Sequence, residues 1–183
     1  MTEGELLALE RLGAPDLTRD EYFGIIDRKT ARLFSAACSV PALIPPAIPE
    51  ADRILGRYGE ALGVCFQLVD DMLDFTGREE ELGKPVLSDL KEGKLTLPLI
   101  LALPRVGPAR RRLVEQVLED RDFTRVAPEE ILELVRAEGT LEEVGELAEA
   151  YAENARRELD GLPAGDAREA LELAPDFVLY RRS

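Results

Sequence analysis

A short stretch with a row of acidic side chains constrains this sequence more than any other feature. Residues 66–74 read FQLVDDMLD, and on a helix Gln67, Asp70, Asp71 and Asp74 would share a stripe about 100° wide. Gly63 falls on the same stripe, where we expect it to leave open space. The apolar residues gather on another side, which predicts a helix with one packing face and one acidic face.

Two interpretations of the acidic face remain open. Carboxylates four positions apart on a helix repel each other, so something must neutralise them. Oxygen ligands of this kind suit Mg²⁺, which takes one or two carboxylates together with substrate phosphates. The alternative is a solvated helix surface, which is common in a chain with a net charge of −14. A short acidic motif alone favours this second interpretation.

The lysines are few and unevenly placed. Only four of the 23 basic residues are lysines, and Lys84, Lys91 and Lys94 closely follow Asp70. A lysine is a compact charge that often binds phosphate. Lys84 and Lys94 each follow a glycine, which lets a backbone come close to a ligand. The alternative is ordinary pairing with the glutamates at positions 79–81, and we expect it mainly for Lys91.

These segments together resemble the trans-prenyltransferases, the polyprenyl (isoprenyl) diphosphate synthases. FQLVDDMLDFTG at 66–77 and GKPVLSDLKEGKLTLPLI at 83–100 resemble the second aspartate-rich region of that family. Residues 22–34 resemble its Lys–Thr helix, residues 4–10 its Gly-Glu-Leu segment and residues 170–182 its C-terminal helix. The resemblance covers nearly the whole chain and implies an all-α fold, a helical bundle of the isoprenoid-synthase type.

The resemblance also implies a metal site and a reaction centre. Asp70, Asp71 and Asp74 match the second metal-binding motif, and Asp70 is the residue most expected to bind Mg²⁺ directly. Thr30 and Gln67 match polar residues that line the reaction centre. The catalytic residues that the resemblance implies are Lys29, Thr30 and Gln67.

Diphosphate ligands are implied in the same way. Lys29 and Lys84 match lysines that contact the allylic diphosphate, and Lys94 matches the lysine of the Gly-Lys-x-Thr segment. Arg181 and Arg182 resemble a basic C-terminus that closes over isopentenyl diphosphate, although an exposed tail explains them equally well.

The implied function is condensation of an allylic diphosphate with isopentenyl diphosphate. The allylic diphosphate leaves as a carbocation-like species forms, the double bond of isopentenyl diphosphate attacks it, and a proton is lost. Mg²⁺ and lysines would stabilise the charge on the departing diphosphate. Terpene cyclases share this chemistry, but their metal motifs differ from the one found here.

One family feature is absent from the sequence. The family carries a first aspartate-rich motif well upstream, whereas the 69 residues before Asp70 hold no paired aspartates. We therefore expect an incomplete bundle, roughly the C-terminal half, with little activity alone. A shortened reading frame, a cleaved product or a natural half-subunit would each fit, with a homodimer or a partner supplying the missing half. The alternative function is a non-catalytic helical partner subunit of a prenyl diphosphate synthase.

Length and composition fit this picture. We expect 183 residues to form a single all-helical domain, residues 1–183, the C-terminal portion of a polyprenyl synthetase domain. The charge of −14 argues against nucleic acid as a partner. With no apolar run of about 18 residues and no secretory signal, we expect no membrane span and a cytoplasmic location. Cys38 and Cys65 should be reduced, and the absence of His excludes His-based metal sites.

The pattern of turn and cap residues predicts helices throughout. Thr18 and Glu21 have the spacing of a capping box, which should open a helix that runs to about Ser39. The prolines at positions 41–49 predict a loop, residues 77–95 a charged loop, and Pro175 an interruption of the last helix. The expected helices are residues 3–12, 18–39, 51–75, 97–103, 110–119, 128–137, 141–159 and 167–182.

Overall fold

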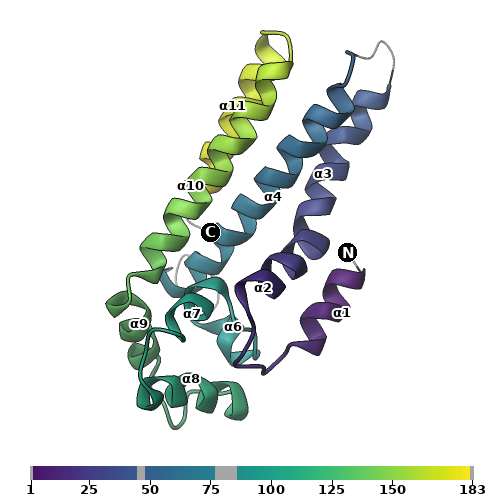
Figure 1. Ribbon diagram of the computed structural model, residues 1–183. Helices are drawn as coiled ribbons and strands as arrows, with labels where there is room; N and C mark the ends of the chain where they lie inside the picture. Colours follow the sequence, from purple (N-terminus) through teal and green to yellow (C-terminus); the bar gives the residue numbers. More distant parts are fainter. Residues whose placement is uncertain (1, 45–47, 77–85, 182–183) are drawn as a thin grey trace. The chain divides into compact units, whose positions relative to one another are not determined.

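A computed structural model of the chain describes residues 2–44, 48–76 and 86–181, and all of its regular elements are helical (Figure 1). The all-α prediction is confirmed for this part of the chain. The elements are α1 (Thr2–Glu10), α2 (Arg19–Ile26), η1 (Asp27–Ala31), α3 (Arg32–Ser39), η2 (Val40–Leu43), α4 (Ala51–Thr76), α6 (Ser88–Lys91), α7 (Leu97–Ala102), α8 (Pro108–Asp120), α9 (Pro128–Ala137), α10 (Thr140–Glu158), η3 (Leu159–Gly161) and α11 (Asp166–Leu179).

The predicted capping box is confirmed at the start of α2. The Glu21 carboxylate accepts hydrogen bonds from the backbone N–H of Thr18 at 2.9 Å and from its hydroxyl at 2.7 Å. In return, the N–H of Glu21 donates to the Thr18 hydroxyl at 3.3 Å. Two backbone donors that the helix cannot satisfy itself are thus paired, which sets where α2 begins.

The helix that follows is not a single α-helix. The sequence predicts one helix from residue 18 to about 39, but η1 is a π-helical turn between α2 and α3. The N–H of Arg32 bonds to the carbonyl of Asp27, five residues back instead of four. Such a turn holds one extra residue, and π-turns frequently occur at functional sites.

Two further expectations are wrong. Residues 77–95 were expected to form a loop, but α6 adds a helical turn after Asp74, whose carboxylate accepts hydrogen bonds at the start of that turn. Positions 77–85 lie outside the described residues.

Pro175 was expected to interrupt the last helix, yet α11 continues through it. The carbonyl that Pro175 leaves unpaired, that of Leu171, accepts a hydrogen bond from Tyr58.

The described residues group into two compact units, and each has its own packing. The first comprises residues 2–5, 25–69 and 146–181; the second comprises residues 6–24 and 70–145. We keep the single domain of residues 1–183 as a prediction, because the continuous helices α4 and α10 contribute to both units.

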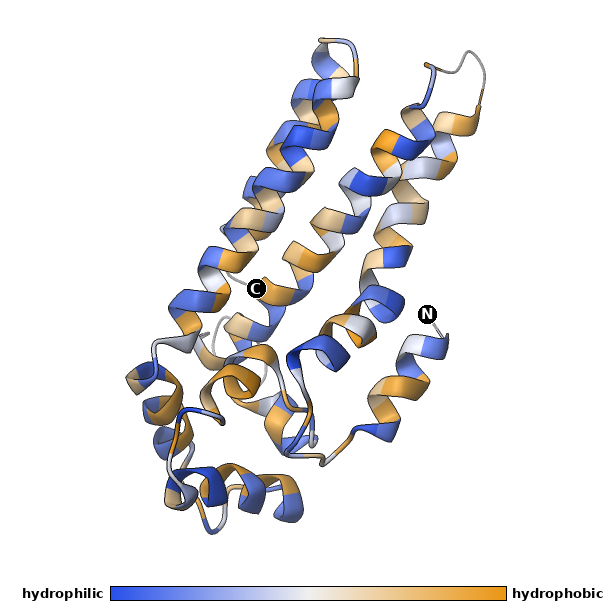
Figure 2. Ribbon diagram, viewed as in Figure 1, coloured by the Kyte–Doolittle hydropathy of each residue, from blue (hydrophilic) through white to orange (hydrophobic). Residues whose placement is uncertain are grey.

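Each unit buries apolar side chains between its helices. In the first, Tyr58 and Leu62 of α4 pack with Ala155 and Leu159, and Phe34 of α3 lies against them. In the second, α7 is buried along most of its length and is apolar throughout (Figure 2). The fully or nearly fully buried residues contributed by α8 and α9 are Val114, Val117, Leu118, Ile131, Leu134 and Val135.

Candidate functional site

Helix α4 carries the acidic motif, and the environments of its three aspartates differ. Asp71 is 2% exposed and Asp74 is 1% exposed, whereas Asp70 is half-buried. Burial of a carboxylate is costly unless hydrogen bonds compensate it. The motif is therefore neither a uniformly solvated surface nor a row of equivalent metal ligands.

Asp71 is paired inside the second unit. The Tyr22 hydroxyl donates a 2.7 Å hydrogen bond to Asp71 Oδ2, and the N–H of Leu97 lies 3.4 Å from the same oxygen. Burial raises the pKa of Tyr22 well above its usual value, and the neighbouring charge of Asp71 raises it further. Tyr22 therefore remains a hydrogen-bond donor, and it connects α2 to the motif helix.

Asp74 caps the short helix α6. Its Oδ1 accepts hydrogen bonds from the Ser88 N–H at 3.1 Å and the Ser88 hydroxyl at 2.7 Å. Its Oδ2 accepts one from the Asp89 N–H at 3.1 Å. These bonds satisfy donors at the start of α6 and fix the chain that leads to Lys94.

The chemistry of the three carboxylates decides which of them fits a metal. Across residues 2–44, 48–76 and 86–181, no group of three or more carboxylate, cysteine or histidine side chains is arranged to hold a metal ion. Mg²⁺ needs only one or two carboxylates when phosphate oxygens and water complete its shell. Asp70, the least buried of the three, is the most accessible to a metal ion and its phosphate and water ligands.

The predicted reaction-centre residues Thr30 and Gln67 are brought together in the first unit. The hydroxyl of Thr30 donates a 3.0 Å hydrogen bond to Gln67 Oε1. Lys29 precedes Thr30 in the π-helical turn η1, and its Nζ lies 3.5 Å from Glu5 Oε2. Gly63, expected to border open space, instead packs closely: a Cβ on it would lie 2.8 Å from Ala31 Cα.

The other predicted diphosphate ligands have different outcomes. Lys94 Nζ lies 2.6 Å from Glu92 Oε2 and 3.2 Å from Asp89 Oδ1. Burial lowers the pKa of Lys94, but hydrogen bonds to these carboxylates outweigh that effect and raise it. Lys84 lies outside the described residues. Lys94 is thus held by carboxylates that a diphosphate would have to displace.

Arg181, shortly after the last helix, contacts the motif helix within the first unit. The Arg181 guanidinium stacks on the Phe66 ring, with its carbon 3.9 Å from the ring centre, and Nη2 donates to the Phe66 carbonyl at 3.3 Å. This is a cation–π contact adjacent to Gln67. Arg182 lies outside the described residues. For Arg181 the exposed-tail interpretation is wrong.

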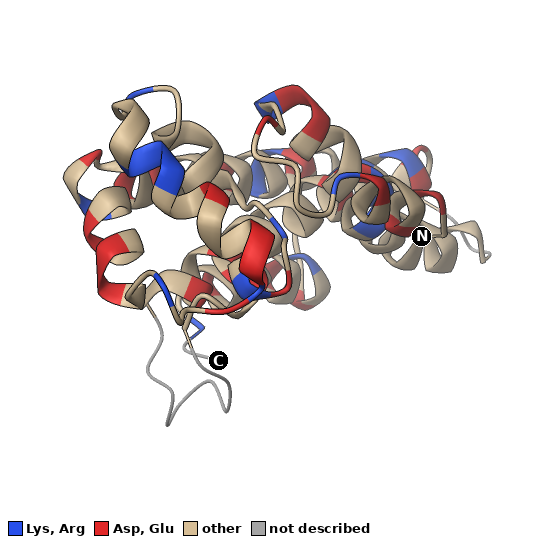
Figure 3. Cartoon of the chain, turned by 90° about the horizontal axis from the view of Figure 1, so that it is seen from below, with Lys and Arg blue, Asp and Glu red and all other residues tan. Residues whose placement is uncertain are grey.

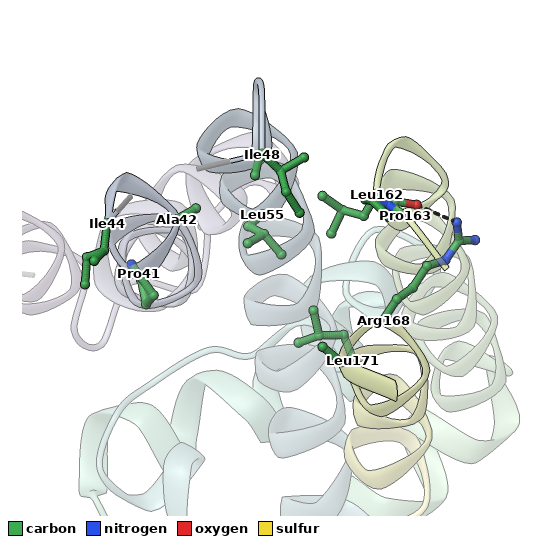
Figure 4. Close-up of a pocket in the computed structure, with 11 residues that line it drawn as sticks. Pro41, Ala42, Ile44, Ile48, Leu55, Leu162, Pro163, Arg168 and Leu171 are labelled. Carbon is green, nitrogen blue, oxygen red and sulfur yellow. Dashed lines mark hydrogen bonds between the residues drawn. The ribbon is translucent and has the colours of Figure 1, made fainter. Parts of the chain in front are cut away.

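One pocket within the first unit lies away from the predicted site residues. It has a volume of about 340 Å³ and an apolar lining that includes Ile48, Leu55 and Leu171 (Figure 4). Arg168 also lines it and donates to the carbonyl of Leu162 at 3.1 Å. None of the predicted site residues lines it.

Charged side chains elsewhere form ion pairs, some between close neighbours in the chain and some between distant residues, such as Arg57 and Glu158 at 2.6 Å. Acidic and basic residues follow one another closely along the helices (Figure 3), and Arg112 holds Glu119 at 2.8 Å. Cys38 and Cys65 are both free, as predicted. No helix formed by the described residues is long and apolar enough to cross a bilayer.

The sequence did not reveal two contributors to the site. Tyr22 and Asp71 are 49 positions apart, and no spacing rule connects them. The π-helical turn at Lys29 was also missed, because its residues continue the helical pattern on both sides. A single sequence carries no signal that Tyr22 and Asp71 are buried together.

Comparison with known proteins places this arrangement in a family. The chain matches the family model described as polyprenyl synthetase over residues 1–135. It is 39% identical to octaprenyl diphosphate synthase of Escherichia coli over 171 residues, which cover 93% of this chain and 53% of that protein. It is 38% identical to a short chain isoprenyl diphosphate synthase of Methanothermobacter thermautotrophicus, over 98% of this chain and 54% of that protein.

Solved structures agree in fold. A polyprenyl synthase from Caulobacter crescentus, described as complexed with calcium and isoprenyl diphosphate, has a TM-score of 0.91 and 40% identity, and the match covers all of this chain and 56% of that one. A decaprenyl diphosphate synthase from Rhodobacter capsulatus has a TM-score of 0.89 and 37% identity, with the same coverage. The fold is that of the all-α isoprenoid synthases, and the chain belongs to the polyprenyl synthetase family. It spans about half the length of the relatives that it matches.

Proposed function

We propose that this chain forms part of a trans-prenyltransferase that condenses isopentenyl diphosphate with an allylic diphosphate. The observation that carries the proposal is the difference in burial among the aspartates of α4: Asp71 and Asp74 are buried, whereas Asp70 is the most accessible. Family membership and the Caulobacter crescentus relative, whose description names calcium and isoprenyl diphosphate, support it.

In this proposal Asp70 holds Mg²⁺, and Asp71 and Asp74 keep the motif helix in place. Bound Mg²⁺ would supply positive charge to the departing diphosphate. Lys29 contributes a further cationic group, and Lys84 and Lys94 are proposed as additional diphosphate ligands. Thr30 and Gln67 form a hydrogen-bonded pair that supplies fixed dipoles at the reaction centre.

For the 183-residue chain alone, we propose ligand binding with little turnover. Its sequence has one paired-aspartate motif, so the metal ion is held by one acidic helix only. Positioning contributes a large part of such catalysis. The alternative, a non-catalytic partner subunit, predicts no product even when a complete synthase variant lacking its own second motif is added.

The test uses heat denaturation with Mg²⁺ and inorganic diphosphate. A ligand that binds only the folded chain stabilises it by about 2.7 kcal/mol at 100 times its Kd, and we expect a modest rise in Tm that requires both components. Mg²⁺ alone lacks the bridging phosphate, and diphosphate alone meets a chain with a charge of −14. Asp70→Asn should abolish the joint effect, and the control Asp52→Asn, exposed on the same helix, should keep it. An unchanged joint shift in Asp70→Asn would refute the metal site.

We also propose that the chain self-associates or binds a partner. Leu173 and Phe177 lie one turn apart on α11 and Tyr180 directly follows the helix, and they are 56%, 79% and 76% exposed. Exposed apolar patches commonly mark interaction surfaces. Light scattering should detect a dimer or larger species, and a monomer at high concentration would contradict the proposal. Free Cys38 and Cys65 fit the proposed cytoplasmic location.

A further inference from the structure

A π-helical turn places Lys29 and Thr30 in the first unit. In η1 the N–H of Arg32 bonds to the carbonyl of Asp27, so this turn contains one residue more than an α-helical turn. The extra residue changes the direction in which the side chains within the turn project. Lys29 and Thr30 are two of the five residues of η1, so their positions depend on this turn being kept.

The backbone of the turn lies against Gly4 of α1. A Cβ on Gly4 would lie 2.4 Å from the backbone nitrogen of Lys29 and 2.7 Å from its Cα. Both are backbone atoms, so no rotation of a side chain could relieve the overlap. Gly4 is buried, and ion pairs join its two neighbours to the turn: Glu3 to Arg28 at 3.2 Å and Glu5 to Lys29 at 3.5 Å.

A second helix approaches the same turn through another glycine. A Cβ on Gly63 of α4 would lie 2.8 Å from the Cα of Ala31, the last residue of η1, which is fully buried. One turn later, Gln67 of α4 accepts the hydrogen bond from Thr30. The turn therefore contacts glycines on two different helices, and neither contact leaves space for a methyl group.

Helix propensity gives independent support for a specific role of Gly4. Gly4 lies in the first turn of α1, where alanine would be favoured over glycine by up to about 1 kcal/mol, the difference found in helix interiors. Glycine at this position is explained by the approach of the Lys29 backbone. Any side chain at position 4 must displace that backbone, and the ammonium group of Lys29 moves with it.

We propose that Gly4 is a positioning residue for diphosphate binding, because it creates the space in which the π-helical turn holds Lys29. The inference rests on the proposed function, which makes Lys29 a diphosphate ligand. Gly4 itself touches no substrate in this proposal. Its effect is transmitted through the backbone of residues 28 and 29.

The experiment compares four variants by titration with inorganic diphosphate in excess Mg²⁺: Gly4→Ala, Lys29→Ala, the double variant, and the control Gly56→Ala. A Cβ on Gly56 of α4 would meet only ordinary contacts, at 3.5 Å from Ser35 Oγ. Small displacements of binding groups can be costly, so we expect Gly4→Ala to weaken diphosphate binding roughly tenfold. The control should retain the wild-type affinity.

The double variant separates positioning from simple destabilisation. If Gly4 acts through Lys29, Gly4→Ala should cause no further loss of affinity in a chain that already carries Lys29→Ala. The effect of Gly4→Ala on Tm should still be seen in that double variant. Losses that multiply in the double variant would overturn the inference. The inference would also be overturned if Lys29→Ala weakens diphosphate binding while a folded Gly4→Ala variant keeps the wild-type affinity. Unchanged affinity in Lys29→Ala would refute the proposed role of Lys29, and the inference with it.

A measurement on the wild-type chain covers the case in which Gly4→Ala does not fold. If the glycine contacts hold the turn in place, the Arg32 amide should be protected from hydrogen exchange in the ligand-free chain, because it bonds to the Asp27 carbonyl. Nuclear magnetic resonance can follow this amide with and without Mg²⁺ and diphosphate. Protection without ligand supports the inference, and exchange at the rate of an unstructured chain overturns it.

Discussion

The hydroxyl of Tyr58 donates a 2.8 Å hydrogen bond to the backbone carbonyl of Leu171, the carbonyl that Pro175 cannot pair. In an α-helix this carbonyl would accept the N–H of residue 175, which proline lacks. Tyr58 is 1% exposed, so its hydroxyl is a donor removed from bulk water. The bond compensates for the proline and joins α4 to α11 within the first unit.

Removing this hydroxyl should therefore destabilise the chain. Tyr58→Phe removes the side-chain donor of the Leu171 carbonyl at a partly buried position, and we expect a loss of about 0.5–1.5 kcal/mol in the free energy of unfolding. Pro175→Ala restores an N–H that can pair with the same carbonyl. In that background Tyr58→Phe should cost clearly less, as measured by urea denaturation. Equal costs in the two backgrounds would show that the hydroxyl does not compensate for Pro175.

Asp74 and Asp70 should respond differently to the same substitution. Asp74→Asn replaces a carboxylate oxygen with an NH₂ group that faces the donors of Ser88 and Asp89. We expect it to lower the free energy of unfolding by about 1–3 kcal/mol. Asp70→Asn, at a half-buried position, should change it by less than about 0.5 kcal/mol. Urea denaturation of both variants checks this, and similar losses would mean that all three aspartates are structural.

The helices were predictable from the sequence because their signals are local. Helical periodicity placed α4 and α9, and the Thr18–Glu21 spacing identified where α2 begins. Family resemblance brought Thr30 and Gln67 to one centre, and the structure joins them by a hydrogen bond. These outcomes depend on contacts between neighbours in the chain or on a motif.

The features that could not be predicted from the sequence depend on hydrogen bonds and close packing between residues that lie far apart in the chain. That Asp74 caps α6 depends on Ser88, which lies 14 positions away along the chain. The π-turn at Lys29 packs against Gly4 and Gly63, and in α11 Tyr58 bonds to the carbonyl that Pro175 cannot pair. No local preference of residues 27–31 or of Pro175 reveals these partners.

Stability should depend on Glu21 in the acidic range. The backbone N–H of Thr18, and then its hydroxyl, lower the pKa of Glu21 in the folded chain. A carboxyl with a lowered pKa contributes stability above its unfolded value of about 4.3, and the contribution is lost as pH falls through the folded pKa. The gap in Tm between wild type and Glu21→Gln should thus be largest near neutral pH and narrow below about pH 4. Thermal melts from neutral to acidic pH test this, and a gap independent of pH would contradict it.

Glu5 should compete with diphosphate for Lys29. Its Oε2 lies 3.5 Å from Lys29 Nζ, and both side chains are partly exposed. Exposed ion pairs contribute up to about 1 kcal/mol, so Glu5→Gln should raise the affinity for diphosphate in excess Mg²⁺ roughly twofold to fivefold. Glu3→Gln is a matched control, because it removes the same charge from the same helix but breaks the ion pair with Arg28 instead. Titration should show a larger gain for Glu5→Gln, and high salt should reduce that gain. Equal gains would reflect net charge alone, and weaker binding in Glu5→Gln would mean that Glu5 holds Lys29 in its binding position.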